Sequence, residues 1–195
     1  MRSLEELLRL KKTIRIIGFD DAPFQKERGS SVKIAGVVCS NTRFEGMLWG
    51  EVTMDGTDAT EALVELLKGS KFYEQVNMIL IDGIAVGGFN IIDLPALSEE
   101  LKRPCLAVMR KYPDLQAVDQ ALMNFIDYQQ RKQLITKAGK VYRHQAFYYQ
   151  VSGCNPVTAA NVLEQVTDKG NVPEALRLAH LIGAAIMTGQ SSNRA

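Results

Sequence analysis

Three aspartates stand where predicted strands end, and they are the residues of this chain best suited to chemistry. Asp20 lies at the end of IRIIGFDD, Asp55 follows GEVTM, and Asp82 ends MILID. Neighbouring strands can bring such ends to one edge of a sheet, so we expect a carboxylate cluster. Carboxylate oxygens are hard ligands that suit Mg²⁺ or Mn²⁺, and an ion held by a few of them keeps positions open for phosphate and water. Phosphodiester chemistry is therefore the first hypothesis.

Each of these aspartates also has an ordinary structural interpretation. A single aspartate at a strand end is more often a turn residue or a helix cap, and three at related ends weaken that interpretation. Asp58 lies at the start of a predicted helix, so it fits a cap as well as it fits the DGTDAT motif. Asp21 follows Asp20 directly, and successive strand side chains point to opposite faces, so only one of the two enters the same site. Strand alternation alone does not decide which of the two it is.

The elements that position these residues follow from hydrophobic patterning. Three opening strands are predicted, the second and third forming an antiparallel hairpin, at residues 13–19, 32–40 and 43–53. Strands and helices then alternate, which indicates parallel pairing, at residues 57–70 (helix), 78–82 (strand), 91–102 (helix) and 104–109 (strand). The remaining predictions are a helix at 114–135, a strand at 146–153, helices at 155–167 and 173–189, and a frayed tail at 190–195. The result is an α/β fold with a mixed sheet flanked by helices.

Composition limits the class of protein. The chain has 195 residues, of which 46% are hydrophobic and 23% are charged, so one domain over residues 1–195 is expected. Its apolar runs are too short to span a bilayer. The first residues lack the apolar segment of a signal peptide and fit a short amphipathic helix, so we expect a cytoplasmic protein. The sequence does not predict the oligomeric state.

The charge of the whole chain, +1, does not indicate nucleic acid or membrane as a partner. Two local basic groups can contact phosphates, although a solvated surface is the commoner role of such groups: Arg131, Lys132, Lys137, Lys140, Arg143 with His144, and Lys102, Arg103, Arg110 with Lys111. A structural or surface role is favoured for both His144 and His180, since neither has ligand spacing to a second His or Cys. The three widely spaced cysteines, Cys39, Cys105 and Cys154, are predicted to be buried thiols.

Four segments of the chain resemble one known family. FDDAPF, GEVTMDGTDATEAL, ILIDGIAVGGFNIIDL and AVMRKYPDL occur in the order found in the archaeal endonuclease dU proteins, which are relatives of endonuclease V. The match runs from about Ile14 to Leu115. This resemblance implies an RNase H-like fold.

The resemblance also implies roles for residues. Asp20, Asp55 and Asp82 would be catalytic and would bind Mg²⁺, with Mn²⁺ as a substitute. Endonuclease V has Glu where this chain has Asp55, and a lysine near the phosphate where this chain has Arg110, whose planar fork differs from a point charge. Its tyrosine-containing wedge has no clear counterpart; Phe44 is the best candidate, although a strand Phe is more often a core residue.

Residues that can contact the substrate include Lys111 and three glycines of the GIAVGGFN segment: Gly83, Gly87 and Gly88. Glycine lets the backbone approach a ligand, but these three also fit a strand-to-helix turn. The function implied is a metal-dependent endodeoxyribonuclease that cleaves DNA containing a deaminated base, with deoxyuridine the expected lesion, in DNA repair. Two alternatives remain: an endonuclease directed at RNA, and a non-catalytic nucleic-acid-binding module of the same fold.

Overall fold

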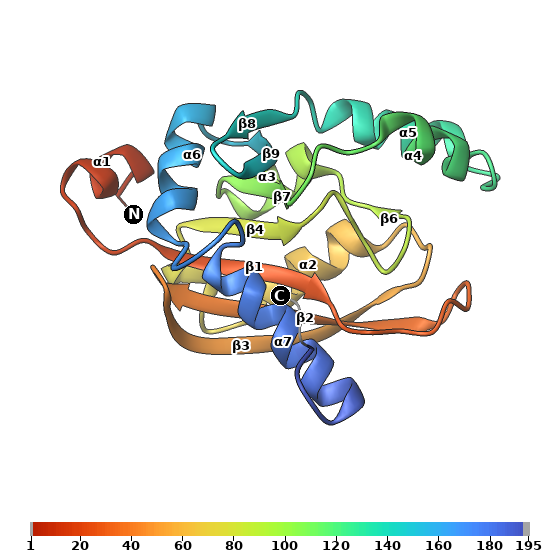
Figure 1. The fold of residues 1–195 in the computed structure, drawn as a ribbon, viewed down its shortest axis with the longest axis horizontal. Helices are drawn as coiled ribbons and strands as arrows, with labels where there is room; N and C mark the ends of the chain where they lie inside the picture. The colour runs from red at the N-terminus through yellow and green to blue at the C-terminus, as the bar shows by residue number, and fades with distance from the viewer. Residues whose placement is uncertain (1, 193–195) are drawn as a thin grey trace.

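A seven-stranded mixed sheet forms the centre of the protein, with the strand order β3-β2-β1-β4-β7-β9-β8 (Figure 1). The computed structural model describes residues 2–192, so residues 193–195 of the predicted tail lie outside the described part. The strands are β1 (Arg15–Asp21), β2 (Ser31–Ser40), β3 (Arg43–Thr53), β4 (Met78–Asp82), β7 (Cys105–Met109), β8 (Tyr142–His144) and β9 (Phe147–Ser152). A separate short hairpin consists of β5 (Ala85–Val86) and β6 (Asn90–Ile91).

Strand pairing confirms the predicted order of antiparallel and then parallel strands. β3, β2 and β1 are antiparallel, and β1, β4 and β7 are parallel. β9 then pairs antiparallel with β7, and β8, which the sequence did not predict, pairs antiparallel with β9. The carboxyl ends of β1 and β4 therefore lie at the same edge of the sheet.

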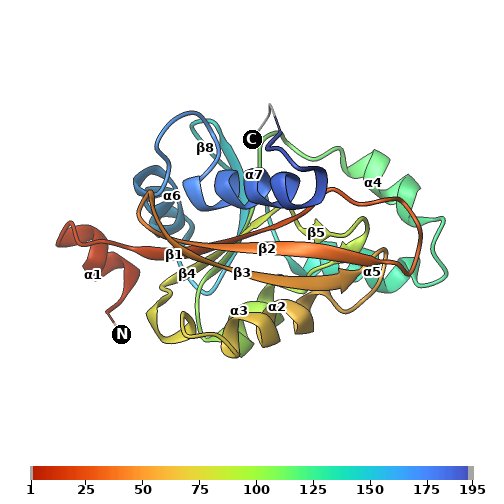
Figure 2. The same ribbon diagram turned by 90° about the horizontal axis from the view of Figure 1, so that it is seen from below.

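Helices cover both faces of this sheet (Figure 2). They are α1 (Leu4–Arg9), α2 (Ala59–Lys68), α3 (Leu94–Leu101), α4 (Leu115–Leu122), α5 (Tyr128–Lys137), α6 (Pro156–Gln165) and α7 (Glu174–Thr188), with a 3₁₀ turn η1 (Tyr73–Gln75). Ile17 and Phe19 of β1 pack on the side of α2 and α3, whereas Ile16 packs on the side of α1, α6 and α7. Burial on both faces explains why β1 and β4 are almost continuously apolar in sequence. Among the described residues no helix is long and apolar enough to cross a membrane.

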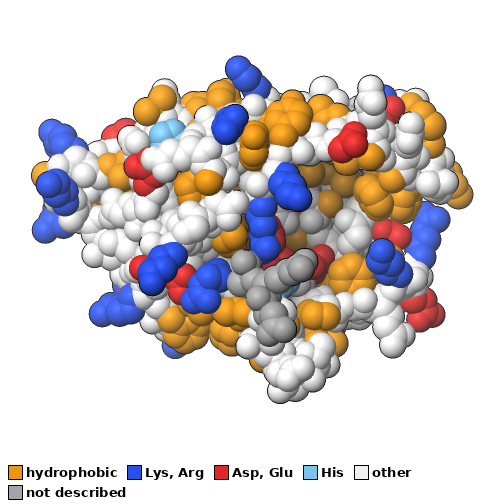
Figure 3. Space-filling model, in the orientation of Figure 1, with side chains coloured by type: hydrophobic (Ala, Val, Ile, Leu, Met, Phe, Trp, Pro, Cys, Tyr) orange, Lys and Arg blue, Asp and Glu red, His pale blue; other side chains and the backbone are white. Residues whose placement is uncertain are grey.

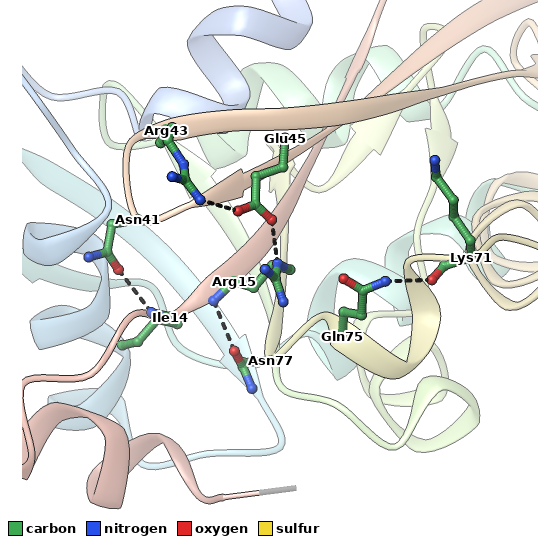
Figure 4. A network of polar contacts seen from close by, with 8 residues as sticks. All are labelled: Ile14, Arg15, Asn41, Arg43, Glu45, Lys71, Gln75 and Asn77. Atoms are coloured by element: carbon green, nitrogen blue, oxygen red, sulfur yellow. Dashed lines mark hydrogen bonds and ion pairs between the residues drawn. The ribbon is translucent and has the colours of Figure 1, made fainter.

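A network of polar contacts lies at the end of the sheet where β1 begins (Figure 4). Arg15 and Arg43 both pair with Glu45, at 2.5 and 2.8 Å. The side-chain oxygens of Asn41 and Asn77 accept hydrogen bonds from the backbone amides of Ile14 and Arg15, each at 2.9 Å. These polar groups are satisfied within the fold, whereas the opposite edge carries the predicted carboxylates.

The single helix predicted over residues 114–135 is wrong. The structure has two helices, α4 and α5, separated by residues 123–127. In that break the ring of Phe125 lies 5.5 Å from the ring of Phe89 and 4.5 Å from the guanidinium of Arg131. These contacts to the β5–β6 hairpin and to α5 draw Phe125 inward, and a continuous helix would not provide them.

The cysteines are free thiols, as predicted. Cys39 and Cys105 are buried, and Cys154 is partly exposed. Burial raises the pKa of Cys39 to about 12 and that of Cys154 to about 11. A thiol that stays protonated at neutral pH is a poor nucleophile, so these residues have a structural role.

Candidate active site

The parallel register of β1 and β4 brings two of the predicted carboxylates together. Phe19 lies beside Ile81, and continuing this register places Asp20 beside Asp82. Because side chains alternate along a strand, both aspartates point to the face covered by α7. Figure 3 shows acidic side chains recessed near the middle of this side of the molecule, with basic side chains next to them. The prediction that these two strand ends meet therefore has a clear geometric basis.

Helix α7 adds a histidine that the sequence did not assign to the site. Nδ1 of His180 lies 2.9 Å from Oδ2 of Asp20. A Cβ added to Gly18 would lie 2.8 Å from the backbone of Ala175, and one added to Gly183 would lie 3.2 Å from Ala22, so α7 runs closely along β1. A rise of about 1.5 Å per helical residue puts His180 about 7.5 Å beyond Ala175. Two strand residues, at about 3.3 Å each, put Asp20 about 6.6 Å beyond Gly18, so the two side chains meet.

The sequence contains one indication of the position of His180. Ala175, Ala179 and Gly183 recur every four residues, which gives α7 a stripe of small side chains. Such a stripe lets a helix lie directly against a neighbouring backbone, and His180 is adjacent to it. His144, by contrast, is not near Asp20 and Asp82. Its Nε2 lies 2.6 Å from Oε1 of Glu164, as expected of a surface histidine.

Burial and charge repulsion both favour the protonated form of the carboxyl groups at this site. The pKa of Asp20 is raised to about 8, first by burial and then by the charges of Asp82 and Asp21. Burial also raises the pKa of Asp82, while the guanidinium of Arg110 opposes the rise. Nη2 of Arg110 lies 3.7 Å from Oδ2 of Asp82, so the predicted basic residue is beside the carboxylates. Perturbed pKa values of this kind are common at functional sites.

Asp21 and Asp55 are both attached to the β5–β6 hairpin. The Gly87 amide donates to Oδ2 of Asp21 at 2.7 Å, and the Gly87 carbonyl accepts from the Asp55 amide at 2.8 Å. Oδ1 of Asp55 accepts from the Phe89 amide at 2.8 Å. Asp21 points to the opposite face from Asp20, as strand alternation predicts. Asp55 is therefore connected to Asp20 and Asp82 only indirectly, through the hairpin. Among residues 2–192 its carboxylate makes no hydrogen bond with either of them.

The glycines of the hairpin segment have the positive φ values that favour glycine. The φ angles are 86° at Gly83, 57° at Gly87 and 85° at Gly88. Space is restricted at Gly88, where an added Cβ would lie 2.4 Å from Oδ1 of Asp55. Apart from its chain neighbours, one of which is Asp82, no described residue has an atom within 4 Å of a Cβ added at Gly83. Gly83 therefore leaves room beside the carboxylates, whereas Gly88 is required by the turn.

Phe44 is not placed at the site. It pairs with Cys39, which pairs with Ile16 at the far end of β1 from Asp20. Four strand residues separate Ile16 from Asp20, or about 13 Å along the strand. Phe44 lies next to the turn of the predicted hairpin, so the strand pairing itself places it away from Asp20. Lys111 is exposed beside Arg110, so it remains near the carboxylate edge.

Two other expectations are corrected by the contacts. Asp58 makes no side-chain cap to α2; its carboxylate instead accepts hydrogen bonds from Thr53 and Asn90, at 2.8 Å from the hydroxyl of Thr53 and 2.6 Å from Nδ2 of Asn90. Arg131, predicted as part of an exposed basic stretch, is buried, with only 4% of its side chain exposed. It therefore cannot contact phosphate from that position.

The donor chemistry fits a divalent cation on Asp20 and Asp82. No group of three or more His, Cys, Asp or Glu side chains within residues 2–192 is arranged to hold an ion. Mg²⁺ does not require such a cage, because it is commonly held by one or two carboxylates with water and phosphate as its other ligands. The pKa of Asp20 is raised by burial and then by the charges of Asp82 and Asp21, and a cation bound beside these groups would offset both causes by favouring the ionised form.

Comparison with known proteins places this arrangement in a family. The chain is 38% identical over 189 residues to a UPF0215 protein of Pyrococcus furiosus, covering 94% of this chain and 97% of that protein. It is 36% identical over 191 residues to a UPF0215 protein of Methanothermobacter thermautotrophicus, covering 95% and 94%. Among solved structures, a protein of unknown function from Archaeoglobus fulgidus has a TM-score of 0.84 and 35% identity, covering 89% of this chain and 98% of that chain.

More distant structures show the fold. Endonuclease V of Bacillus subtilis has a TM-score of 0.62 with 12% identity, covering 97% of this chain and 84% of that chain. Endonuclease V of Ciona intestinalis, in complex with DNA containing an inosine followed by a ribo-adenosine, has a TM-score of 0.56 with 16% identity, covering 90% and 91%. The predicted RNase H-like fold is thereby confirmed. The family model named Endonuclease dU matches residues 12–187, which include β1, β4 and His180 of α7, and the chain belongs to the Endonuclease dU family.

Proposed function

We propose that this protein is a metal-dependent endonuclease that hydrolyses DNA containing a deaminated base, with deoxyuridine the expected lesion, in DNA repair. The observation that carries the proposal is the pair of buried Asp20 and half-buried Asp82 at adjacent parallel strand ends, flanked by His180 and Arg110. Membership of the Endonuclease dU family supports a nuclease, and the DNA in the Ciona intestinalis complex supports DNA as the substrate.

Asp20 and Asp82 would hold the cation, and Mg²⁺ is the expected one, with Mn²⁺ as a substitute. Such an ion supplies Lewis-acid activation of the scissile phosphate and lowers the pKa of the attacking water. Arg110 lies beside Asp82, where its guanidinium could donate two parallel hydrogen bonds to two oxygens of a phosphate. Asp20 and the Nδ1 atom of His180 are joined by a hydrogen bond whose donor depends on the tautomer of the ring. This bond orients the imidazole toward the site.

The proton chemistry of the site fits a hydrolysis at neutral pH. The imidazole of His180, whose Nδ1 lies 2.9 Å from Oδ2 of Asp20, would accept the proton of the attacking water. Binding of a cation beside Asp20 would lower the pKa of that carboxyl group from about 8, because an opposite charge favours the ionised form, which is the form that holds the ion. Asp55 is proposed as a further contributor, held in place by the hairpin rather than by direct contact with Asp20.

The test uses labelled single-stranded and duplex oligonucleotides that contain one deoxyuridine, one hypoxanthine or a normal base, with matched RNA strands. Each is incubated with Mg²⁺, Mn²⁺ or EDTA and with wild type, Asp20→Asn, Asp82→Asn and Asp114→Asn proteins. Asp114 is an exposed N-cap of α4, and Asn caps helices equally well, so it controls for the loss of a carboxylate. Lesion-directed, metal-dependent nicking by wild type and Asp114→Asn alone supports the proposal.

Other outcomes would reassign the function. Cleavage limited to RNA would retain the chemistry but change the substrate. Binding of nucleic acid without cleavage under any of the metal conditions would favour a non-catalytic module. Full metal-dependent cleavage by Asp82→Asn would count against the carboxylate mechanism.

A further inference from the structure

Arg131 places a buried guanidinium where three distant segments of the chain meet. Its Nε donates to Asp127, one helical turn earlier in α5, at 2.9 Å. Its Nη1 donates to the carbonyl oxygens of Gly56, at 3.1 Å, and Phe89. Its Nη2 donates to the carbonyl oxygen of Asp55 at 2.8 Å. One side chain therefore joins α5 to the turn after β3 and to the β5–β6 hairpin.

The turn that Arg131 holds has a conformation that needs external support. Asp55 has a φ of 54°, in the left-handed region, which costs a non-glycine residue about 1 kcal/mol or more. Hydrogen bonds fix the residue on three sides: its amide donates to Gly87, its Oδ1 accepts from the Phe89 amide, and its carbonyl accepts from Arg131. Arg131 is the only contributor of these three that does not come from the hairpin itself.

Aromatic contacts fix the guanidinium in its own position. The ring of Phe125 lies 4.5 Å from the guanidinium carbon of Arg131 and packs against the ring of Phe89 at 5.5 Å. The guanidinium of Arg28 lies 5.1 Å from the same Phe125 ring. A cation that stacks on an aromatic face and makes hydrogen bonds in its own plane has little freedom to shift.

The β5–β6 hairpin connects the contacts of Arg131 to the carboxylates of the site. The Gly87 carbonyl accepts from the Asp55 amide, and the Gly87 amide donates to the carboxylate of Asp21. Asp21 is the neighbour of Asp20 in β1. Two consecutive hydrogen bonds through one glycine therefore lead from the turn held by Arg131 to the strand end that carries the site.

We propose that Arg131 is a positioning residue for the cleavage reaction: it sets the conformation of Asp55 and the position of the β5–β6 hairpin relative to Asp20 and Asp82. This inference rests on the proposed function, because it assigns Asp55 a role in that reaction. The role requires a planar guanidinium, whose fork reaches three carbonyls and one carboxylate at once. A lysine ammonium at the same place keeps the charge but cannot meet this arrangement.

The test compares Arg131→Lys and Arg131→Met with a matched pair at Arg177, Arg177→Lys and Arg177→Met. Arg177 also lies in a helix and also pairs with an acidic side chain one turn earlier, at 2.6 Å from Glu174, but it contacts neither Asp55 nor the hairpin in the described structure. Hydrogen exchange is measured over residues 53–58 and 86–91, and cleavage is measured with Mg²⁺ to obtain kcat and KM separately.

Both Arg131 variants should show faster exchange in these two segments, with the exchange of β1 and β4 unchanged. Their kcat should fall at least tenfold while KM changes by less than threefold, because substrate contacts remain and the position of Asp55 does not. The Arg177 variants should match wild type. If Arg131→Met fails to fold, Arg131→Lys carries the test, since it keeps the charge and the aliphatic stem.

Wild-type exchange in Arg131→Lys, or wild-type kcat, would overturn the positioning role. Equal losses in the Arg177 variants would also overturn it, because the effect would then reflect helix stability. Failure of the proposed function gives a different result. If the wild-type protein cleaves none of the strands, the proposed reaction is excluded, and the hydrogen-exchange measurement still decides whether Arg131 holds the turn and the hairpin.

Discussion

Asp20→Asn should make the protein more stable at alkaline pH in the absence of divalent metal. In the folded protein the pKa of Asp20 is about 8, raised from 3.8 chiefly by burial, whereas in the unfolded chain the group titrates near its ordinary value. Between these two pKa values the folded state binds more protons than the unfolded state. The free energy of unfolding therefore falls as pH rises from about 4 to about 8, and below that window Asp20 contributes no difference.

The size of the effect follows from the same shift. One pKa unit corresponds to about 1.4 kcal/mol, so a rise of roughly four units places an upper limit of about 6 kcal/mol on the destabilisation by ionised Asp20 above pH 8. Asparagine has the same shape, cannot ionise, and its carbonyl can still accept a hydrogen bond from His180. We expect Asp20→Asn to exceed wild type by about 2–5 kcal/mol at pH 8.5 and to differ much less at pH 4.5.

The assay is urea denaturation in EDTA at pH 4.5, 6.5 and 8.5, followed by circular dichroism, with Asp114→Asn as the control. Addition of Mg²⁺ at pH 8.5 should raise the stability of wild type more than that of Asp20→Asn, because only wild type has the full carboxylate pair. A difference between wild type and Asp20→Asn that stays constant from pH 4.5 to pH 8.5 would refute the assigned burial and repulsion at Asp20.

Three further substitutions test other contacts of the site. Gly18→Ala should cost about 1–3 kcal/mol, because the new Cβ would lie 2.8 Å from the backbone of Ala175; an unchanged melting temperature would show that α7 does not pack so closely on β1. Gly88→Ala should cost about 1–3 kcal/mol and also reduce cleavage, since φ is 85° and the Cβ would lie 2.4 Å from Oδ1 of Asp55; wild-type cleavage would exclude a need for this position of Asp55. Arg110→Lys should retain more cleavage than Arg110→Ala, because the charge remains while the bidentate geometry is lost, and equal rates would exclude a role for the charge.

The fold was predictable where local pattern and global structure agree. The apolar strands β1 and β4, the hairpin of β2 and β3, and the helix α2 each have a periodicity that identifies them without tertiary information. The segment at residues 114–135 shows where this fails. Its helical periodicity continues through residues 123–127, and the break depends on Phe125 packing against Phe89, a partner in another segment. Helix propensity depends on the local sequence alone, so it could not predict a break that depends on this long-range contact.

The candidate site also contains some residues that the sequence could predict and others that it could not. Asp20 and Asp82 could be assigned because each ends an apolar strand, and the order of the strands then requires that they meet. His180 and Arg131 could not be assigned by the same reasoning, since their partners Asp20 and Asp55 lie 160 and 76 residues earlier in the chain. The stripe of small residues in α7 indicates close packing, but it does not identify Asp20 as the partner of His180.

These two long-range contacts also explain what the helices after β7 contribute to the site. A carboxylate pair on strand ends is open on two sides, toward the face covered by α7 and toward the hairpin. α7 supplies His180 on the first side, and α5 supplies Arg131, which fixes the hairpin on the second. The site is therefore complete only when helices from the second half of the chain have packed against strands from the first half. Loss of α7 packing should abolish cleavage even if β1 and β4 remain paired, because Asp20 would lose its contact with His180.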